Sequence, residues 1–441
     1  MKQVYAKFAG VFQSLFLAAA LSVAVLVPAG CASSGTSGQP TTAQGVVTED
    51  PNSMPDIGWQ TWHQRQTLSK PSPDSSGQQR PGLETVAGDF RAQPVKVALL
   101  VPMSGRSADL GQAMLKAAQL ALFDVGNTTF ELMPIDTQST PQGAADAARQ
   151  AASAKSDLIL GPIFAEDVRA AKPVASGASI PMIAFTTDWK LAGNDTYVMG
   201  FLPFAQVTRV TQYAQSKGLD RFAVYAPQTE YCDVVINTLQ RSGAQITRTG
   251  RYAAGETALQ SMVQDFATQA GAQPDAGSAG GFVFNTLMLP VGGESLRTLV
   301  SLFDMAGVNN KNTRFIGTGL WDDESLARNP ALYGGWFAAP EPSLRADFDK
   351  RYVETYGGAA PRLATLAYDA TALAAVLSRT PDPKPFSRQR LTNPRGFAGI
   401  DGVFRFRADG LNDRGLAILE IQNGRARVID PAPTAFVGSG S

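Results

Sequence analysis

The run VKVALLV at residues 95–101 decides the fold, because it is a continuous apolar segment that ends abruptly at Pro102-Met103-Ser104-Gly105. Short apolar runs of this kind are typical of strands that are covered on both faces of a sheet. From Gly111 to Phe123 the apolar residues recur at spacings of three and four, which predicts a helix. Further strands are expected at 130–135, 158–160 and 181–185. Helices are expected between them at 142–154 and at 167–176, the latter interrupted by Pro173. Strands that alternate with helices predict an α/β fold with a mostly parallel sheet.

The alternation restarts after residue 203 and predicts a second sheet of similar size. Its helices are expected at 204–217, 231–242, 256–270 and 294–305. Its strands are expected at 222–226, 244–252, 281–284, 314–317 and 335–338. Two more helices, at 344–356 and 363–377, precede a strand-rich tail at 402–407, 416–421 and 426–429. Asn423-Gly424 in this tail predicts a tight hairpin turn.

The first thirty residues predict an export signal. Lys2 and Lys7 precede an apolar run at residues 11–27, and small residues lead to Cys31. The Ala-Gly-Cys ending resembles a bacterial lipobox, which implies that Cys31 is lipidated and anchors the chain to a membrane. The alternative is that Cys31 is an ordinary small residue of the signal. Because residue 32 is Ala and not Asp, the resemblance also implies sorting to the outer membrane.

Residues 32–93 predict a disordered tether. Ser, Thr, Gly, Pro, Gln and Asp dominate this segment, and it lacks apolar periodicity. A segment of this composition does not bury enough apolar surface to offset the entropy of ordering it.

The composition argues against several classes of function. The chain of 441 residues has one histidine, His63, and two cysteines, Cys31 and Cys232. This scarcity excludes a metal site with several histidines and a four-cysteine zinc site. Lys+Arg and Asp+Glu are both 38, so no charge surplus favours nucleic acid. Since nucleotide-binding motifs are also missing, we expect no enzyme activity, no metal and no cofactor.

Several motifs, in their order and spacing, resemble the type I periplasmic binding proteins of the Leu/Ile/Val-binding kind. They are VALLVPMSGRSADLG (97–111), DLILGPI (157–163), SIPMIAFTTD (179–188), TRFIGTGLWD (313–322), LAYDATALAAVL (366–377), GIDGVFRF (399–406) and DRGLAILEI (413–421). The resemblance implies two doubly wound, Rossmann-like lobes with a central ligand cleft and three crossovers.

On that resemblance the chain divides into five parts. Residues 1–31 are the lipoprotein signal and residues 32–93 the tether. Lobe 1 comprises residues 94–201 plus 338–432, lobe 2 comprises residues 202–337, and residues 433–441 are a tail. The strand-rich segment before this tail is expected to return and cover lobe 1.

The ligand site is expected where the strands of the two sheets end, because ligands of open α/β sheets bind beyond the carboxyl ends of the strands. The loops at these ends, with the roles that the resemblance implies, give the following ligand-binding residues: Ser104, Ser107, Phe164, Thr186, Thr187, Tyr231, Asn285, Trp321 and Asp322. Each has a structural alternative. Ser104 and Ser107 could cap the helix that follows, and Asp322 could cap the next helix rather than pair with an ammonium group. Tyr231 and Trp321 could pack against neighbouring residues.

Two functions follow from the resemblance. The first is an exported lipoprotein that binds a small amino-acid-like ligand and presents it to an ABC permease. The second is the activator of penicillin-binding proteins that shares this fold, an outer-membrane lipoprotein that regulates peptidoglycan synthesis by contact with a synthase. One departure from the pattern of the amino-acid binders supports the second function. Phe164-Ala165-Glu166 stand after the Gly161-Pro162 turn, where the amino-acid binders have Ser or Thr for the ligand's carboxylate.

Overall fold

The computed structural model describes residues 94–127, 130–271, 282–379 and 382–436. The predicted signal, Cys31 and the predicted tether lie outside these residues. The described strands form a five-stranded sheet, a seven-stranded sheet and a two-stranded ribbon. No helix in the described ranges is long and apolar enough to span a membrane.

The first sheet is parallel throughout, with the strand order β2-β1-β3-β4-β5. Its strands are β1 (Val95–Val101), β2 (Phe130–Asp136), β3 (Leu158–Leu160), β4 (Met182–Ala184) and β5 (Thr196–Val198). Val97, Ala98, Leu99 and Leu100 are fully buried. The apolar run at 95–101 is therefore an inner strand covered on both faces, as predicted.

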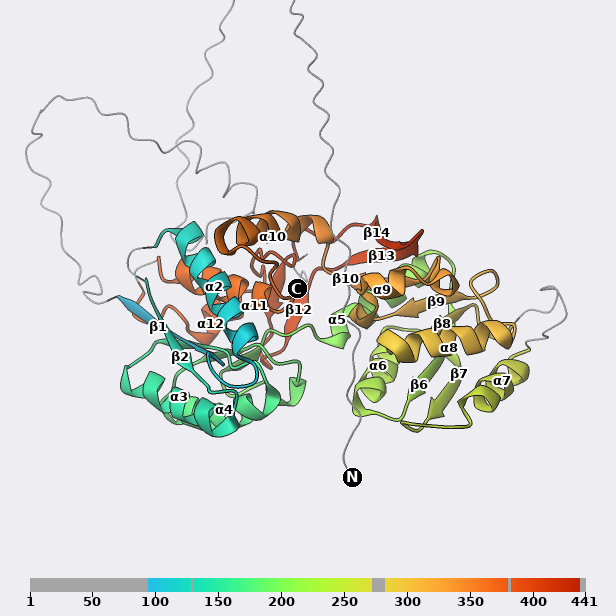
Figure 1. Ribbon diagram of the computed structural model, residues 1–441, viewed down its shortest axis with the longest axis horizontal. Coiled ribbons are helices and arrows are strands. Elements are labelled where there is room, and N and C mark those ends of the chain that lie inside the picture. Colours follow the sequence, from blue (N-terminus) through green and yellow to red (C-terminus); the bar gives the residue numbers. More distant parts are fainter. Residues whose placement is uncertain (1–93, 128–129, 272–281, 380–381, 437–441) are drawn as a thin grey trace, which may run out of the picture. The chain divides into compact units, whose positions relative to one another are not determined.

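Helices cover both faces of this sheet (Figure 1). They are α2 (Ala108–Val125), α3 (Pro141–Ser153), α4 (Ala165–Gly177), α10 (Pro342–Tyr356), α11 (Ala364–Leu377) and the short α12 (Arg388–Leu391), with the 3-10 turn η1 (Trp189–Leu191) after β4. Ala98 and Leu100 of β1 pack with α3 and α4, whereas α2, α10 and α11 pack together through residues such as Phe348 and Tyr368. The expected interruption at Pro173 is wrong, because α4 continues through it. A proline inside a helix removes a backbone hydrogen bond and crowds the preceding turn, but Ala171 and Ala175 on either side are buried in the core, and this packing holds the helix together.

The second sheet has the strand order β14-β13-β10-β9-β8-β6-β7. Its strands are β6 (Arg221–Pro227), β7 (Gln245–Tyr252), β8 (Thr286–Met288), β9 (Arg314–Gly317), β10 (Trp336–Ala339), β13 (Ala417–Gln422) and β14 (Arg425–Asp430). Its helices are α5 (Pro203–Ser216), α6 (Glu230–Arg241), α7 (Leu259–Gln269), α8 (Gly293–Met305) and α9 (Glu324–Ala327), with the 3-10 turns η2 (Gly319–Trp321) and η3 (Pro330–Leu332). Alternate residues of β6 join opposite cores: Val224 packs with α5 and α6, and Tyr225 packs with α7 and α8.

The strand expected at 281–284 is wrong, because β8 begins at Thr286. Phe282 and Phe284 gave the apolar signal, but they stack on each other with ring centroids 5.8 Å apart. Phe284 also packs near Phe266 of α7, at 6.1 Å between centroids. Contacts between rings bury Phe284 and partly bury Phe282 before β8 begins.

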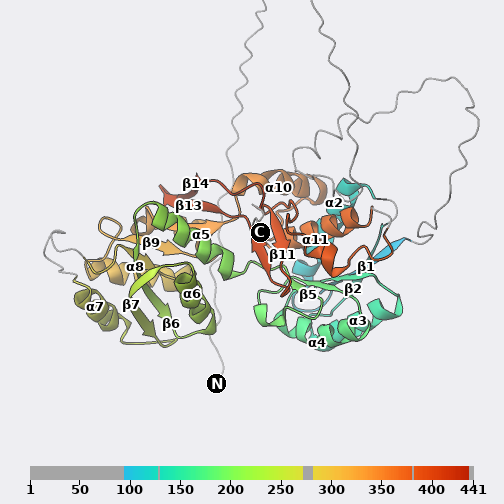
Figure 2. The same cartoon turned by 180° about the vertical axis from the view of Figure 1, so that it is seen from behind.

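The strand-rich tail is divided between the two sheets, which corrects its assignment to lobe 1. The ribbon of β11 (Phe404–Phe406) and β12 (Asn412–Arg414) lies beside β5, whereas β13 and β14 belong to the second sheet (Figure 2). There β13 pairs antiparallel with β10. Ile418 packs on one face of the sheet and Leu419 on the other. Because both faces of β13 are apolar, the strand is buried only in a sheet that helices cover on both sides. The predicted hairpin is confirmed, since Asn423 and Gly424 both have positive φ, 48° and 82°.

Three short segments connect the two sheets. Residues 199–202 run from β5 to α5, residues 340–341 from β10 to α10, and residues 415–416 from β12 to β13. The fold therefore has the two α/β lobes and three crossovers that the sequence implied.

Candidate functional site

The loop after β1 is fixed by hydrogen bonds rather than by helix capping. The Ser104 hydroxyl donates to Asp136 Oδ2 at 2.6 Å, and the backbone N–H of Met103 donates to Asp136 Oδ1 at 2.8 Å. Burial alone would raise the pKa of Asp136, but hydrogen bonds from Ser104, Gln138 and Met103 lower it overall. Ser107 stands at the N-cap of α2 without a side-chain capping bond. Ser104 thus ties the ends of β1 and β2 together.

Close backbone packing fixes the base of this loop. A Cβ on Gly111 would lie 1.8 Å from the carbonyl oxygen of Pro102, so only glycine fits at this position. The loop after β3 is similarly close, because a Cβ on Gly161 would lie 2.2 Å from the carbonyl oxygen of Leu100. Both loops are therefore pressed against the end of β1.

The loop after β3 leads into α4 with Phe164 at the N-cap, where its side chain accepts no hydrogen bond. The first turn of α4 carries two acids, Glu166 and Asp167. Glu166 pairs with Arg169 at 2.6 Å on the surface. Asp167, by contrast, is only 3% exposed, and its Oδ2 has no hydrogen-bond partner. The site residues expected from the sequence include Phe164 in this loop but not Asp167.

The two threonines after β4 differ in exposure. Thr186 is buried, and its hydroxyl oxygen accepts from the backbone N–H of Asp188 at 3.1 Å. Thr187 is exposed. A Cβ on Gly200 would lie 2.2 Å from the carbonyl oxygen of Thr186, so this loop lies directly on the first crossover. Thr187 is therefore the residue of this pair whose side chain faces solvent.

In the second lobe, Tyr231 and the loop after β9 lie together. The Tyr231 hydroxyl donates to Thr318 Oγ1 at 2.9 Å. Burial raises the pKa of Tyr231 to about 12, although the bond to Thr318 acts in the opposite direction. The backbone N–H of Gly319 donates to Gln206 Oε1 at 2.7 Å. The loop is therefore tied to both α6 and α5.

Trp321 is corrected from a ligand contact to a core residue. Its side chain is fully buried, and its Nε1 donates to the carbonyl oxygens of Leu289 (3.2 Å) and Val291 (3.1 Å). A Cβ on Gly317 would lie 2.1 Å from the indole ring. The ring therefore has neither exposed surface nor a free donor for a ligand.

Asn285 is also corrected, because it lies at the amino end of β8. Its side-chain Oδ1 accepts from the backbone N–H of Arg221 at 3.2 Å, and its backbone carbonyl accepts from the backbone N–H of Arg314 at 2.9 Å. These partners begin β6 and β9, so Asn285 joins strand starts at the edge opposite to the predicted site. The error follows directly from the misplaced strand at 281–284.

Asp322 is exposed at the end of η2, beside Leu320, whose side chain is 48% exposed. Its surroundings still desolvate the carboxylate, which raises the pKa of Asp322, while Arg362 and Arg345 act to lower it. The predicted capping role is not the one observed, because Asp323 caps α9. Arg345 and Arg362 are neighbours that sequence reasoning missed, since they come from a different part of the chain.

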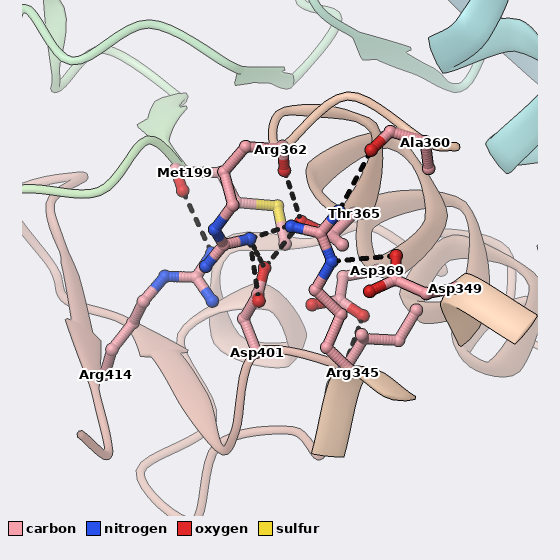
Figure 3. A network of polar contacts seen from close by, with 10 residues as sticks. Met199, Arg345, Asp349, Ala360, Arg362, Thr365, Asp369, Asp401 and Arg414 are labelled. Carbon is pink, nitrogen blue, oxygen red and sulfur yellow. Dashed lines mark hydrogen bonds and ion pairs between the residues drawn. The ribbon is translucent and has the colours of Figure 1, made fainter. Parts of the chain in front are cut away.

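A hinge cluster lies beside the first and third crossovers, and it consists of Phe201, Arg362, Asp369, Asp401 and Arg414. Arg362 pairs with the fully buried Asp401 at 2.9 Å, and Arg414 donates to the carbonyl of Met199 at 3.0 Å (Figure 3). The guanidinium carbons of Arg362 and Arg414 lie 4.3 and 5.0 Å from the Phe201 ring centroid. Arg414 therefore links the first and third crossovers.

Asp369 is the acid of the hinge cluster whose protonation changes near neutral pH. Its Oδ1 accepts from the backbone N–H of Ile400 at 2.8 Å, and the side chain is 3% exposed. Burial and the charge of Asp401 raise the pKa of Asp369 to about 7, whereas Arg414 acts to lower it. Its neighbour Tyr368 donates to Asp124 Oδ2 at 2.7 Å in the core.

Within the described ranges, no group of three or more His, Cys, Asp or Glu side chains is arranged to hold a metal ion. Cys232 is buried, and its thiol contacts the carbonyl of Pro290 at 3.8 Å. The polar groups at the strand ends are hydroxyls, carboxylates and guanidinium groups, which suit a small polar ligand held by hydrogen bonds and charge.

The family model described as Periplasmic binding protein matches residues 94–426, and the chain belongs to this family. One curated relative, an uncharacterized protein of Rickettsia prowazekii (strain Madrid E), is 22% identical over 180 residues. These residues cover 40% of this chain and 48% of that protein, so the chain matches about half the length of this relative.

Three solved structures share the fold. A putative branched-chain amino acid ABC transporter from Rhodospirillum rubrum has a TM-score of 0.66 and 15% identity, and the match covers 76% of this chain and 100% of that one. The substrate-binding protein LivJ from Streptococcus pneumoniae, in complex with isoleucine, has a TM-score of 0.51 and 19% identity over 77% and 100% of the two chains. A solute-binding protein of an ABC transporter from R. palustris, in complex with benzoate, has a TM-score of 0.52 and 17% identity over 78% and 98%. The fold is thus that of the leucine-binding-like, type I periplasmic binding proteins.

Proposed function

We propose that this chain is a non-enzymatic, exported solute-binding protein of an ABC transporter, which binds a small amino-acid-like solute between its lobes and presents it to a permease. The observation that carries the proposal is that three short crossovers alone join the two α/β lobes in the described part of the chain. Few residues join the lobes, so each lobe is able to move as a unit around a ligand. The named solutes of the related structures, isoleucine and benzoate, support a small ligand with a carboxylate.

A ligand screen by thermal unfolding tests this proposal. The full-length chain is melted with each of the twenty standard amino acids, with benzoate and with a polyamine. A ligand at about 100 times its dissociation constant should add about 2.7 kcal/mol to the free energy of unfolding. No shift in melting temperature with any of these solutes would contradict the transport function as stated.

The proposal includes a lipid anchor at Cys31, which places the protein at the periplasmic side of a membrane, in particular the outer membrane. Its support is the lipobox-like ending of the export signal and Ala32 after it. Cells that express Cys31→Ser should release the protein from the membrane fraction, and a labelled fatty acid should label only the unsubstituted chain. A substituted protein that stays in the membrane fraction would contradict the anchor.

A second candidate function is activation of a peptidoglycan synthase by protein contact, and an exposed aromatic residue favours it. Phe123 on α2 has 85% of its side chain exposed. Aromatic residues, Phe included, are enriched in the cores of protein interfaces. The test is binding to a penicillin-binding synthase with the Phe123→Ser variant as the comparison. Equal binding by both proteins, or no binding, would reject a role for this surface.

A further inference from the structure

Two side chains of β12 fasten the third crossover to the first. Val198, Met199 and Gly200 follow one another where β5 enters the first crossover, and the backbone carbonyl of each accepts a hydrogen bond. Asn412 Nδ2 donates to Val198 at 2.7 Å and to Gly200 at 2.9 Å. Arg414 Nη2, directly before the third crossover, donates to Met199 at 3.0 Å. We call these hydrogen bonds from Asn412 and Arg414 the crossover joint.

The guanidinium group of Arg414 is only partly satisfied in this joint. The side chain is 7% exposed, and within the described part of the chain its Nε and Nη1 have no hydrogen-bond partner. Its Cζ lies 5.0 Å from the ring centroid of Phe201 and 5.4 Å from that of Phe404. Buried donors of a charged group that lack an acceptor are costly. Arg414 therefore has two donors that a second acceptor could use.

The carboxyl group of Asp369 holds the loop that packs on the third crossover. Asp369 Oδ1 accepts from the backbone N–H of Ile400 at 2.8 Å. Three residues further on, the carbonyl of Val403 accepts from the backbone N–H of Gly415, the first residue of the third crossover, at 2.8 Å. A Cβ on Gly402 would lie 2.8 Å from the carbonyl oxygen of Gly415, so the loop and the crossover are in close contact. Asp369 is thus tied, through one loop, to the crossover that Arg414 precedes.

Two charged groups of the hinge cluster act directly on Asp369, whose Oδ2 has no hydrogen-bond partner among the described residues (Figure 3). Asp401 repels the ionised carboxyl, and Arg414 attracts it. Asp401 is itself paired with Arg362 at 2.9 Å. Other titratable groups around α11 are Arg345 and Asp349, which pair at 3.0 Å, Asp322 after η2, and Tyr368, Asp124 and Arg351, which bond to one another. Among all these groups, Arg414 is the cation without an acidic partner.

We propose that Asp369 is a proton-operated switch of the crossover joint. Protonated Asp369 does not attract Arg414, whose guanidinium group then stays on the carbonyl of Met199. Ionised Asp369 accepts the free donors of Arg414 and draws the guanidinium group away from Met199, which loosens the first and third crossovers from each other. The inference goes beyond the proposed function, because it concerns the movement of the lobes and not the solute.

The pH range of the switch follows from the two arrangements of Asp369. In the fastened joint, burial and the charge of Asp401 raise its pKa to about 7. In the loosened joint, direct contact with Arg414 lowers its pKa, because an opposite charge favours the ionised form. Loosening therefore releases a proton. It becomes more favourable as the pH rises toward about 7, by up to about tenfold per pH unit, and levels off above that pH.

Amide hydrogen exchange in the full-length protein, without solute, tests the switch. The backbone N–H groups of Val198 and Gly415 donate to the carbonyls of Gly410 and Val403, both at 2.8 Å, so their exchange reports on the two crossovers. The exchange rate of each amide is divided by its rate in Asp369→Asn at the same pH, which removes the pH dependence of the exchange chemistry. This ratio should rise by up to about tenfold per pH unit from pH 5 to 7 and stay level from pH 7 to 8.

Asp413→Asn is the matched control for Asp369→Asn. Asp413 stands beside Arg414 in β12, but it is 30% exposed and pairs with Arg405 at 2.9 Å. This variant should keep the pH dependence of the unsubstituted protein. If Asp369→Asn does not fold, the unsubstituted protein is corrected for the intrinsic exchange rates of unstructured amides and should give the same profile.

Three outcomes would overturn the inference. The first is a ratio that stays constant from pH 5 to 8. The second is a loss of the pH dependence in Asp413→Asn, which would show that any charge near β12 has the same effect. The third is exchange of Val198 and Gly415 as slow as that of Leu99, a buried residue of β1, because these amides would then open only with the whole fold. Since no solute enters the experiment, none of these outcomes bears on the proposed function.

Discussion

Charged side chains are arranged differently in two regions of this chain. In the hinge cluster, the charges of two acids (Asp369 and Asp401) and two arginines (Arg362 and Arg414) balance one another beside the first and third crossovers. At the edge of the first sheet, the buried Asp167 has one carboxylate oxygen without a hydrogen-bond partner, and burial raises its pKa while the charge of the exposed Arg106 acts to lower it. The difference is that opposite charges at the hinge are in direct contact and those at the sheet edge are not, although Asp369 Oδ2, like Asp167 Oδ2, also has no hydrogen-bond partner in the described part of the chain. Four measurements test this distinction, from the largest expected effect to the smallest.

Breaking the ion pair of the hinge cluster should have the largest effect. Arg362→Met leaves the fully buried Asp401 without its closest counter-charge, at 2.9 Å in the unsubstituted protein. Loss of one partner from a buried pair costs about 3–5 kcal/mol, and we expect the lower end because Arg362 is 35% exposed. Chemical denaturation measures the change.

Arg388→Met is the matched control for that substitution. Arg388 pairs with Asp195 at 3.4 Å, but both side chains are more than half exposed, 56% and 59%. A surface pair contributes about 0–1 kcal/mol. Equal losses of stability in the two variants would show that the ion pair of the hinge cluster contributes no more to the free energy of unfolding than an exposed pair does.

The hinge cluster should also impose a pH dependence on stability. The folded pKa of Asp369, about 7, is raised above its ordinary value of 3.8. Between these values the folded state binds more protons than the unfolded state, so this residue lowers the free energy of unfolding as the pH rises from 3.8 toward about 7. Asp369→Asn should reduce the slope of the free energy of unfolding against pH by up to about 1.4 kcal/mol per pH unit in this range.

Denaturation at several pH values measures this slope in both proteins. Asn keeps the acceptor for the backbone N–H of Ile400, so only the titration is removed. Parallel stability profiles for Asp369→Asn and the unsubstituted protein would contradict a titration of Asp369 in this range.

An uncharged hydrogen bond should have a smaller effect than the buried ion pair. Tyr231→Phe removes the donor to Thr318 Oγ1 at 2.9 Å and keeps the ring. A neutral hydrogen bond contributes about 0.5–1.5 kcal/mol to stability. Thermal unfolding should show a loss of this size, and a loss as large as that of Arg362→Met would contradict the order proposed.

The smallest effect is expected for the exposed ion pair between Lys190 of η1 and Glu230 of α6, which join the two lobes. The side chains are 62% and 57% exposed, so Lys190→Gln should lower stability by less than about 1 kcal/mol. Thermal unfolding at low and high salt measures it, and the difference should vanish at high salt. A salt-independent loss would show that the pair is shielded from solvent.

Periodic patterns made the fold predictable from sequence. The apolar runs at 95–101, 158–160 and 314–317 are strands with the predicted bounds. The strand at 281–284 was misplaced, because Phe284 and, in part, Phe282 are buried by ring contacts and not by strand pairing. That error placed Asn285 at the wrong edge of the sheet. Apolar residues alone do not distinguish a buried strand from a buried loop.

The candidate site was predictable as a set of loops but not residue by residue. The loops that carry Ser104, Phe164, Thr187, Tyr231 and Asp322 were all placed at strand ends by their spacing. Trp321 belongs to such a loop too, but its ring lies in the core. Whether these loops bind a ligand stays a prediction. Asp167 was missed because its distinctive property is burial without a partner, which no sequence pattern encodes.

The sequence by itself determined the α/β alternation, the hairpin at Asn423-Gly424 and the loops that end at the carboxyl edges of the sheets. These features depend on local spacing, which a single chain segment contains. The tertiary structure alone decided which sheet receives each part of the tail, and it brought Arg362, Asp401 and Arg414 around Phe201. Those outcomes depend on contacts between residues far apart in the chain, where burial and charge are set by packing.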